Sequence, residues 1–230
     1  MTVQDAAADA PVPDPADPAT VLLVDLDGTV TDSFPGIAAS FVHAMTTMGR
    51  PAPSDEELRH VAGPPLLDTL HAYGFTGADA DRATAAYRER YERLGWRENA
   101  VFDGMAALLA DLAAAGRTLA IATSKFETTA RRILEHFGLA DHFAVIAGST
   151  ADGTRRSKAQ VIARALHVLG LDPKTTPVVM IGDRSHDVDG AASFGIPAIA
   201  VGWGYALPGE VDEAMWTVET VPQLREVLGV

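Results

Sequence analysis

The sequence contains no cysteine. This absence excludes disulfide bonds, thiolate metal sites and a cysteine nucleophile, and it fits a reducing compartment. Basic residues are also scarce, because 18 lysines and arginines stand against 31 aspartates and glutamates, a formal net charge of −13. Such a charge argues against general nucleic-acid binding and against docking on anionic membranes. It would also repel phosphorylated ligands, so a phosphate site in this chain needs local cations.

Long hydrophobic runs are missing as well. No uninterrupted apolar stretch approaches the length of a transmembrane helix. Residues 1–19 are rich in Ala, Asp and Pro and lack the basic start and apolar centre of a signal peptide. We therefore expect a disordered acidic extension over residues 1–19 and, as the default, a cytoplasmic location.

Apolar residues make up 47% of the chain, and they occur in short runs that alternate with helical patterns. Short apolar runs closed by Asp, Gly, Ser or Thr are typical of buried strands, and amphipathic stretches that end before Gly are typical of helices. Their alternation predicts an α/β fold with a doubly wound parallel sheet. The expected strands are 21–25, 118–123, 143–148, 178–183 and 198–202, and the expected core helices are 105–115, 126–137 and 158–169.

The gap between the first two expected strands is unusually long. Roughly ninety residues separate them, whereas a crossover needs about 10–30 residues. The gap contains four helical patterns, at 37–48, 54–61, 66–73 and 78–94, and the second opens with a capping-box sequence, Ser54-Asp55-Glu56-Glu57. We therefore expect a core domain built from residues 20–33 and 101–230, and an inserted all-helical cap domain over residues 34–100.

Two aspartates follow the first expected strand, in the segment Asp25-Leu26-Asp27-Gly28-Thr29. Alternation along a strand places them on opposite faces unless the chain bends at Gly28. Neighbouring buried carboxylates need a cation or a reaction to offset their repulsion, although two aspartates in an ordinary turn are the simpler alternative. The segment resembles the first motif of the haloacid dehalogenase superfamily, whose core is Rossmann-like. The resemblance implies that Asp25 attacks phosphorus as the nucleophile and that Asp27 is the general acid/base.

Two later segments carry groups suited to phosphate. Thr123 and Ser124 end an expected strand and open an expected helix, where hydroxyls and free amides bind phosphate or simply cap the helix. Lys158 begins a helix, where its charge opposes the helix dipole and so favours an anionic partner, with Arg155 and Arg156 as rivals for this role. These segments resemble the family's second and third motifs. The resemblance implies catalytic and phosphate-binding roles for Thr123 and Lys158, with Ser124 contributing an amide or hydroxyl.

A further acidic segment, Gly182-Asp183-Arg184-Ser185-His186-Asp187, closes another expected strand. Carboxylates that converge from two strand ends suit a hard cation such as Mg²⁺, while capping aspartates are the alternative. The segment resembles the family's fourth motif. The resemblance implies a Mg²⁺ site formed by Asp25, the backbone carbonyl of Asp27, Asp183 and Asp187, with Asp187 a ligand or a neighbour of the ligands.

Softer matches lie in the expected cap. The break Gly63-Pro64-Pro65-Leu66 resembles the cap loop of the phosphoglycolate phosphatase-like group with a helical C1 cap, especially its 5′-nucleotidase-like branch. Arg88 and Arg93 are candidates to hold an anionic part of the substrate, together with Gly63 and Pro64 in the loop. A solvated helix face is the alternative for both arginines.

Together the four segments imply a Mg²⁺-dependent phosphomonoester hydrolase that forms an aspartyl phosphate. The expected substrate is a small phosphorylated metabolite, with a nucleoside 5′-monophosphate or phosphoglycolate as first candidates. A sugar-phosphate mutase and a non-catalytic binding protein on the same fold are the alternatives. Phosphonate hydrolysis is disfavoured, because that subgroup uses a cap lysine and residues 32–100 contain none. No nucleic-acid polymer or membrane is expected as a partner, and the sequence gives no oligomeric state.

Overall fold

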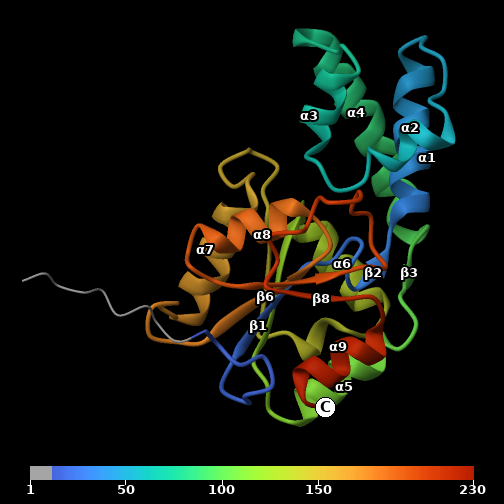
Figure 1. Ribbon diagram of the computed structural model, residues 1–230. Helices are drawn as coiled ribbons and strands as arrows, with labels where there is room; N and C mark the ends of the chain where they lie inside the picture. The colour runs from blue at the N-terminus through green and yellow to red at the C-terminus, as the bar shows by residue number, and fades with distance from the viewer. Residues whose placement is uncertain (1–11) are drawn as a thin grey trace, which may run out of the picture.

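A six-stranded parallel sheet runs through the centre of the core in the computed structural model, which describes residues 12–230 (Figure 1). Its strand order is β5-β4-β1-β6-β7-β8, and each neighbouring pair is parallel. The first strand in the chain is central, so its carboxyl end opens at the middle of one sheet edge, between strands β4 and β6. The strands are β1 (Val21–Val24), β4 (Leu119–Phe126), β5 (Val145–Ser149), β6 (Val178–Gly182), β7 (Ala198–Val201) and β8 (Trp216–Val218).

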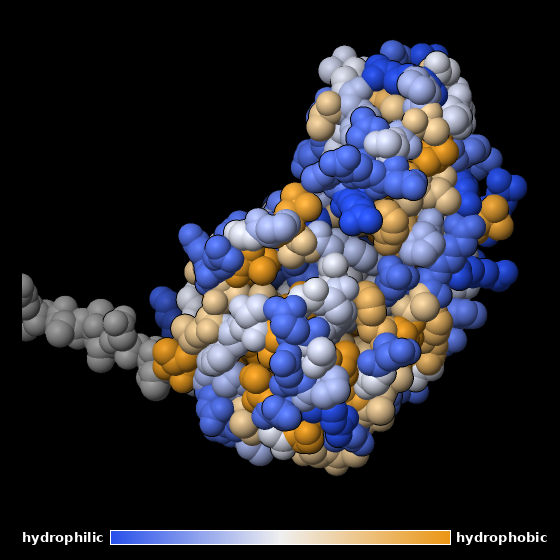
Figure 2. Space-filling model, turned by 45° about the vertical axis from the view of Figure 1, so that its right-hand side comes forward, coloured by the Kyte–Doolittle hydropathy of each residue, from blue (hydrophilic) through white to orange (hydrophobic). Residues whose placement is uncertain are grey.

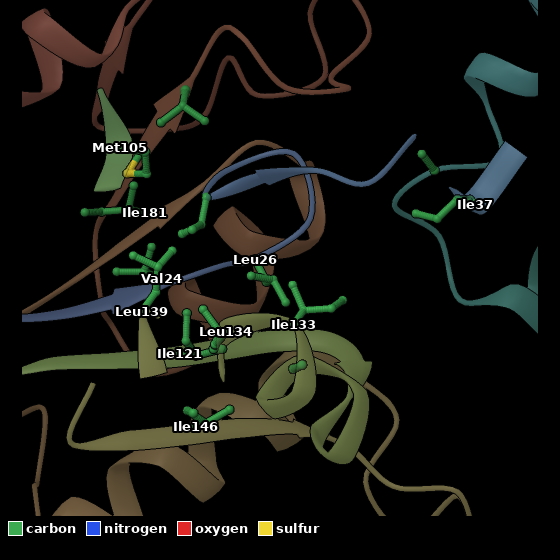
Figure 3. Close-up of a cluster of buried hydrophobic side chains, with 14 of the residues drawn as sticks. Val24, Leu26, Ile37, Met105, Ile121, Ile133, Leu134, Leu139, Ile146 and Ile181 are labelled. Atoms are coloured by element: carbon green, nitrogen blue, oxygen red, sulfur yellow. The ribbon is translucent and has the colours of Figure 1, made fainter. Parts of the chain in front are cut away.

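Helices cover both faces of the sheet because alternate strand residues point to opposite sides. In β1, Leu22 and Val24 pack with the helices of one face, while Val21 and Leu23 pack with those of the other. Figure 3 shows the first of these clusters, with Val24 and Ile121 of neighbouring strands close to Leu134, and Ile181 of the next strand close to Met105. The first face carries α5 (Met105–Ala114), α6 (Glu127–His136) and α9 (Val221–Leu228); the second carries α7 (Lys158–Leu169) and α8 (Ser185–Ala192).

The segment between β1 and β4 forms a helical cap that stands beyond the carboxyl edge of the sheet (Figure 1). Its helices bury their own apolar side chains, among them Phe41 and Leu70, which are fully buried. The second helix begins at the expected capping box, in which Ser54 and Glu57 satisfy each other's backbone amides. The cap comprises α1 (Phe34–Thr47), α2 (Asp55–Arg59), α3 (Leu66–Ala72), α4 (Gly77–Arg93) and the 3₁₀ turn η1 (Gly95–Arg97).

A short antiparallel pair joins the cap to the core. Strand β2 (Thr31–Asp32) leads out of the core, and β3 (Ala100–Val101) leads back beside it. Figure 2 shows the cap as a lobe above the core, with mostly hydrophilic side chains on the face in view. Among the described residues, the helices are too short or too polar to cross a bilayer.

The α/β fold is confirmed, but several local features differ from the expectation. Strand β4 continues to Phe126, and α6 begins at Glu127, so the helix expected from residue 126 starts one residue later. Strand β8, helix α9 and the β2–β3 pair were not expected. Each of these strands has only two or three residues, which is too short to show a period.

The predicted disorder of residues 1–19 falls partly outside the described residues, since residues 1–11 are not described. Residues 14–20 form turns that differ from disorder. The Thr20 hydroxyl donates to the carbonyl of Asp14 at 2.7 Å, and Arg117 donates to the carbonyl of Pro15 at 2.8 Å. A buried arginine with backbone carbonyls as acceptors therefore fixes this segment against the core.

Candidate active site

The residues picked out by the sequence gather where the carboxyl ends of β1, β4 and β6 meet the cap. Open α/β sheets bind ligands at this edge. A cavity of about 400 Å³ lies here, and residues of both the core and the cap line it. Asp25, Asp27, Thr123, Ser124, Lys158 and Asp187 are among its lining residues.

A tight turn after β1 positions the two aspartates of the first motif. Asp25 continues the strand, because its amide donates to the carbonyl of Ile181 in β6 at 2.9 Å. Gly28 has a φ of +81°, and its amide donates to the carbonyl of Thr31 at 2.8 Å. The chain thus bends at Gly28, as the sequence suggested, and both carboxylates line the same cavity.

Three buried carboxylates form one cluster. Oxygen atoms of Asp25, Asp183 and Asp187 lie within 4.8 Å of one another. Burial raises the pKa of Asp25 to about 6, because the ion pair with Lys158 only partly offsets it and the charge of Asp187 adds to it. Burial, together with the charges of Asp187 and Asp25, also raises the pKa of Asp183 well above its ordinary value. The site therefore holds more negative charge than the protein alone neutralises.

Lys158 is the basic group inside this cluster. Its ammonium lies 2.8 Å from Oδ1 of Asp25 and 2.6 Å from Oδ1 of Asp187, and it donates to the carbonyl of Ala122 at 3.0 Å. Burial lowers its pKa, but the charges of Asp187 and Asp25 more than offset this, so the pKa is raised and the lysine stays charged. Of the two rival arginines, Arg155 pairs with Glu127 at 2.6 Å instead.

The cluster suits a hard divalent cation. Its donors are carboxylate oxygens, and the cluster holds three carboxylates but a single lysine, which pairs with Asp25 and Asp187, so a negative excess remains. Backbone amides orient two of them, because Tyr205 donates to Oδ2 of Asp183 at 2.7 Å and Arg184 donates to Oδ2 of Asp187 at 3.1 Å. Such pre-oriented oxygen donors fit Mg²⁺.

Thr123 and Ser124 line the cavity, but not as helix-capping residues. Both lie within β4, and α6 begins three residues after Ser124, at Glu127. The expectation that they open a helix was wrong, because the strand runs on past an irregularity between Ala122 and Phe126. The hydroxyl of the buried Thr123 accepts a hydrogen bond from the amide of Lys125 at 3.2 Å.

The cap supplies a largely apolar wall opposite these charges. Gly63 and Pro64 line the cavity as expected, and Tyr87 stacks on Tyr91 with ring centroids 5.7 Å apart. Arg88 also lines it, with its guanidinium over the ring of Phe126 at 4.8 Å. Further apolar lining comes from Ile37, Val61, Leu66 and Leu67.

Arg93 does not join this wall. It is exposed, and it is not among the residues found to line the cavity in the described part of the chain. Five positions along a helix correspond to a rotation of about 140°, so Arg93 faces away from the side on which Arg88 lies. The structure therefore does not bring Arg93 together with the other candidate site residues.

Sequence reasoning missed three residues of the site: Lys125, Tyr91 and Arg184. The ammonium of Lys125 lies 2.8 Å from Oδ2 of Asp27 and donates to the hydroxyl of Tyr91 at 2.8 Å. Arg184 pairs with Glu210 at 2.7 Å and donates to the carbonyl of Ala62 in the cap. The sequence did carry signals for two of them, because Lys125 lies two residues after Thr123 and Arg184 directly follows Asp183.

Comparisons with known proteins agree with this geometry. Residues 22–201 match the family model described as haloacid dehalogenase-like hydrolase. A protein of Mycobacterium tuberculosis named tyrosine-protein kinase PtkA is 50% identical over 94% of this chain and 75% of its own length. A protein of Pseudomonas aeruginosa named 5′-nucleotidase is 43% identical over 83% of this chain and 86% of its own.

A solved structure gives the same picture. The crystal structure of a predicted phosphatase from Clostridium acetobutylicum superposes with a TM-score of 0.86 at 35% identity, covering 92% of this chain and 99% of that one. This chain belongs to the haloacid dehalogenase-like hydrolase family. The predicted resemblance, the α/β core and the prediction of an enzyme are thereby confirmed.

Proposed function

We propose that this protein is a Mg²⁺-dependent phosphomonoester hydrolase that works through a phosphorylated Asp25. The observation that carries the proposal is the cluster of Asp25, Asp183 and Asp187, two of which pair with Lys158, beside a cavity that Asp25 and Asp27 both line. Phosphoryl transfer needs a nucleophile, charge neutralisation and a proton for the leaving group. These residues supply each of the three.

In the first step, a carboxylate oxygen of Asp25 attacks phosphorus, the ester bond breaks, and Asp27 gives a proton to the departing alkoxide. In the second step, Asp27 takes a proton from water, which attacks phosphorus and releases inorganic phosphate and the free carboxylate of Asp25. Lys158 stabilises the charge on Asp25 and on the phosphoryl oxygens, with Thr123 and Ser124 beside it. A Mg²⁺ ion bound by Asp25, Asp183, Asp187 and the Asp27 carbonyl would neutralise phosphoryl charge.

The substrate we propose is a small metabolite with an apolar or aromatic part, of which a nucleoside 5′-monophosphate is the first example. The cap side of the cavity supports this over phosphoglycolate, because Tyr87 and Leu66 lie there. The carboxylate of phosphoglycolate would need a cation as well as its phosphate, and Arg88 is the cap residue placed to offer one. The relative named 5′-nucleotidase supports the same class.

The test is phosphate release from a panel of nucleoside and sugar monophosphates and phosphoglycolate, with Mg²⁺ and with EDTA. We expect Mg²⁺-dependent release that is lost in Asp25→Asn and kept in Asp189→Asn, a control at an exposed position of the helix that carries Asp187. Release by Asp25→Asn at the wild-type rate would overturn the proposal. Phosphoryl migration without net release would indicate the mutase instead.

The relatives named tyrosine-protein kinase support a second candidate, phosphoryl transfer to a tyrosine hydroxyl. Both reactions would use the same nucleophile and differ in the acceptor, water or a phenol. Incubation with γ-labelled ATP and a tyrosine-containing polypeptide separates them. Label on tyrosine that depends on Asp25 would favour the kinase, and label released only as phosphate would favour the hydrolase.

A further inference from the structure

Lys125 is an unusual residue for this chain. The chain has three lysines, and two of them, Lys125 and Lys158, line the cavity, while Lys174 is exposed. Lys158 faces the nucleophile and the acidic cluster. The side chain of Lys125 is 8% exposed and pairs with Asp27, the other aspartate of the first motif. Each of the two aspartates therefore has its own lysine partner.

Both oxygens of Asp27 have a partner. The ammonium of Lys125 lies 2.8 Å from Oδ2, and the hydroxyl of Ser33 donates to Oδ1 at 2.6 Å. Ser33 immediately precedes the first cap helix, whereas Lys125 belongs to the core strand β4. A carboxylate gripped at both oxygens has a fixed orientation, which a group that must deliver a proton to one atom requires.

Lys125 is itself held from the cap. Its ammonium donates to the hydroxyl of Tyr91 at 2.8 Å, and Tyr91, which is 5% exposed, stacks on Tyr87 in the same helix. Burial raises the pKa of Tyr91, so the phenol stays neutral and accepts this hydrogen bond. A continuous chain of contacts therefore runs from cap helix α4 through Lys125 to the carboxylate of Asp27.

We propose that Lys125 is a positioning residue that aims the Asp27 carboxylate at the leaving oxygen, and that Tyr91 of the cap acts through it. This inference rests on the proposed hydrolase function. Lys125 does not itself touch the reacting atoms. The arrangement makes protonation of the leaving group depend on where α4 lies, so the acid is correctly aimed only when the cap is seated as in this structure.

The test compares two esters that need the acid to different degrees. The leaving group of an alkyl phosphate is a basic alkoxide, which must be protonated by the general acid as it departs. The leaving group of 4-nitrophenyl phosphate is a stable phenolate, which departs with little need for a proton. We would measure kcat/KM, which covers the steps up to departure of the alcohol. For Lys125→Met we expect a loss of about 10²-fold or more on the alkyl ester and less than about 10-fold on the aryl ester, the pattern of a lost general acid.

Tyr91→Phe keeps the stack on Tyr87 and removes the hydroxyl that accepts a hydrogen bond from Lys125. It therefore tests how much the cap contributes to positioning Asp27, with little risk to folding. We expect a loss of several-fold, again confined to the alkyl ester. Lys174→Met is the matched control and should change neither ester. Equal losses on both esters in Lys125→Met, or a raised KM at unchanged kcat, would overturn the proposal and make Lys125 a phosphate-binding or structural residue.

Failure of the underlying function would look different. In that case the wild-type protein would release no phosphate from either ester, or Asp25→Asn would remain active. The role of Lys125 is tested by comparing the loss of kcat/KM on the alkyl ester with the loss on the aryl ester. This comparison has a meaning only where wild-type turnover depends on Asp25.

Discussion

At the scale of single residues, the site depends on a close approach between the backbone of the turn after β1 and the carboxylate of Asp183. Gly28 shows this most clearly. A Cβ atom there would lie 2.2 Å from Oδ2 of Asp183, and the φ of +81° is one that L side chains rarely adopt. The turn that brings Asp27 into the cavity therefore requires glycine for two reasons, conformation and space.

Gly28→Ala should destabilise the protein by about 1–3 kcal/mol and reduce kcat strongly, because the methyl group displaces Asp183. Urea unfolding and steady-state kinetics measure the two effects. Gly49→Ala is the matched control, since its φ is +72° and nothing lies within 4 Å of the new Cβ. Equal activity in both variants would contradict the account.

Asp25 illustrates the cost of a buried carboxylate. Its pKa is raised from 3.8 to about 6, so the ionised form is less stable in the folded state than in the unfolded state. The resulting loss of folding free energy is absent below about pH 4, where Asp25 is protonated in both states, and reaches its full size above about pH 6. Each unit of pKa corresponds to about 1.4 kcal/mol, so it reaches at most about 3 kcal/mol.

Asp25→Asn should therefore be more stable than the wild type in EDTA at pH 7, with the difference shrinking as the pH falls from about 6 to about 4. The measurement is the free energy of unfolding of both proteins by urea across this range. The opposite result would be an Asp25→Asn variant that is less stable than the wild type at pH 7 and equal to it at pH 4. It would show that the carboxylate stabilises the fold.

At the scale of elements, the core contacts the cap through specific side chains as well as through the β2–β3 pair. Arg184, the residue after Asp183, donates to the carbonyl of Ala62 in the cap and pairs with Glu210 of the core. A Cβ on Gly63 would collide with its guanidinium. This arginine therefore docks the cap loop that lines the cavity.

Arg184→Met should raise KM several-fold and destabilise the protein by about 1–3 kcal/mol, because the largely buried Glu210 loses its charged partner. Arg225→Met is the control, since its partner Asp111 is exposed and such pairs contribute less than about 1 kcal/mol. Steady-state kinetics and thermal unfolding check both. An unchanged KM in Arg184→Met would show that this contact does not seat the cap.

Elements also show what the sequence could predict. Five core strands and the cap insertion follow from apolar runs and from one long gap, because burial on both faces gives a parallel strand a continuous apolar pattern. The four motifs predicted which residues lie at the sheet edge, because carboxyl ends of parallel strands meet there. The link from Tyr91 to Asp27 could not be predicted, since it depends on how α4 sits over β4.

At the scale of the whole molecule, the net charge of −13 opposes binding of the phosphorylated substrate that we propose. Local positive charge offsets this repulsion, because Lys125, Lys158 and Arg88 all line the cavity. These lysines already pair with aspartates, so a phosphate needs a further cation. The acidic cluster of Asp25, Asp183 and Asp187 could hold a divalent ion that supplies this positive charge.

Mg²⁺ should stabilise the protein against heat, because binding to the folded state contributes about 2.7 kcal/mol at a hundred times the Kd. Differential scanning fluorimetry over a Mg²⁺ titration, with EDTA as the reference, measures the shift in Tm. Asp183→Asn should abolish it, and Asp189→Asn should not. A shift that survives in Asp183→Asn would place the ion elsewhere.

The most direct test of the central claim is to capture the phosphorylated enzyme. Acid quenching during turnover, followed by peptide mass spectrometry, locates any covalent phosphoryl group. We predict a hydroxylamine-sensitive phosphoryl group on Asp25 in the wild type and none in Asp25→Asn. A phosphoryl group on another residue, or turnover by Asp25→Asn with no phosphorylated enzyme, would contradict the account.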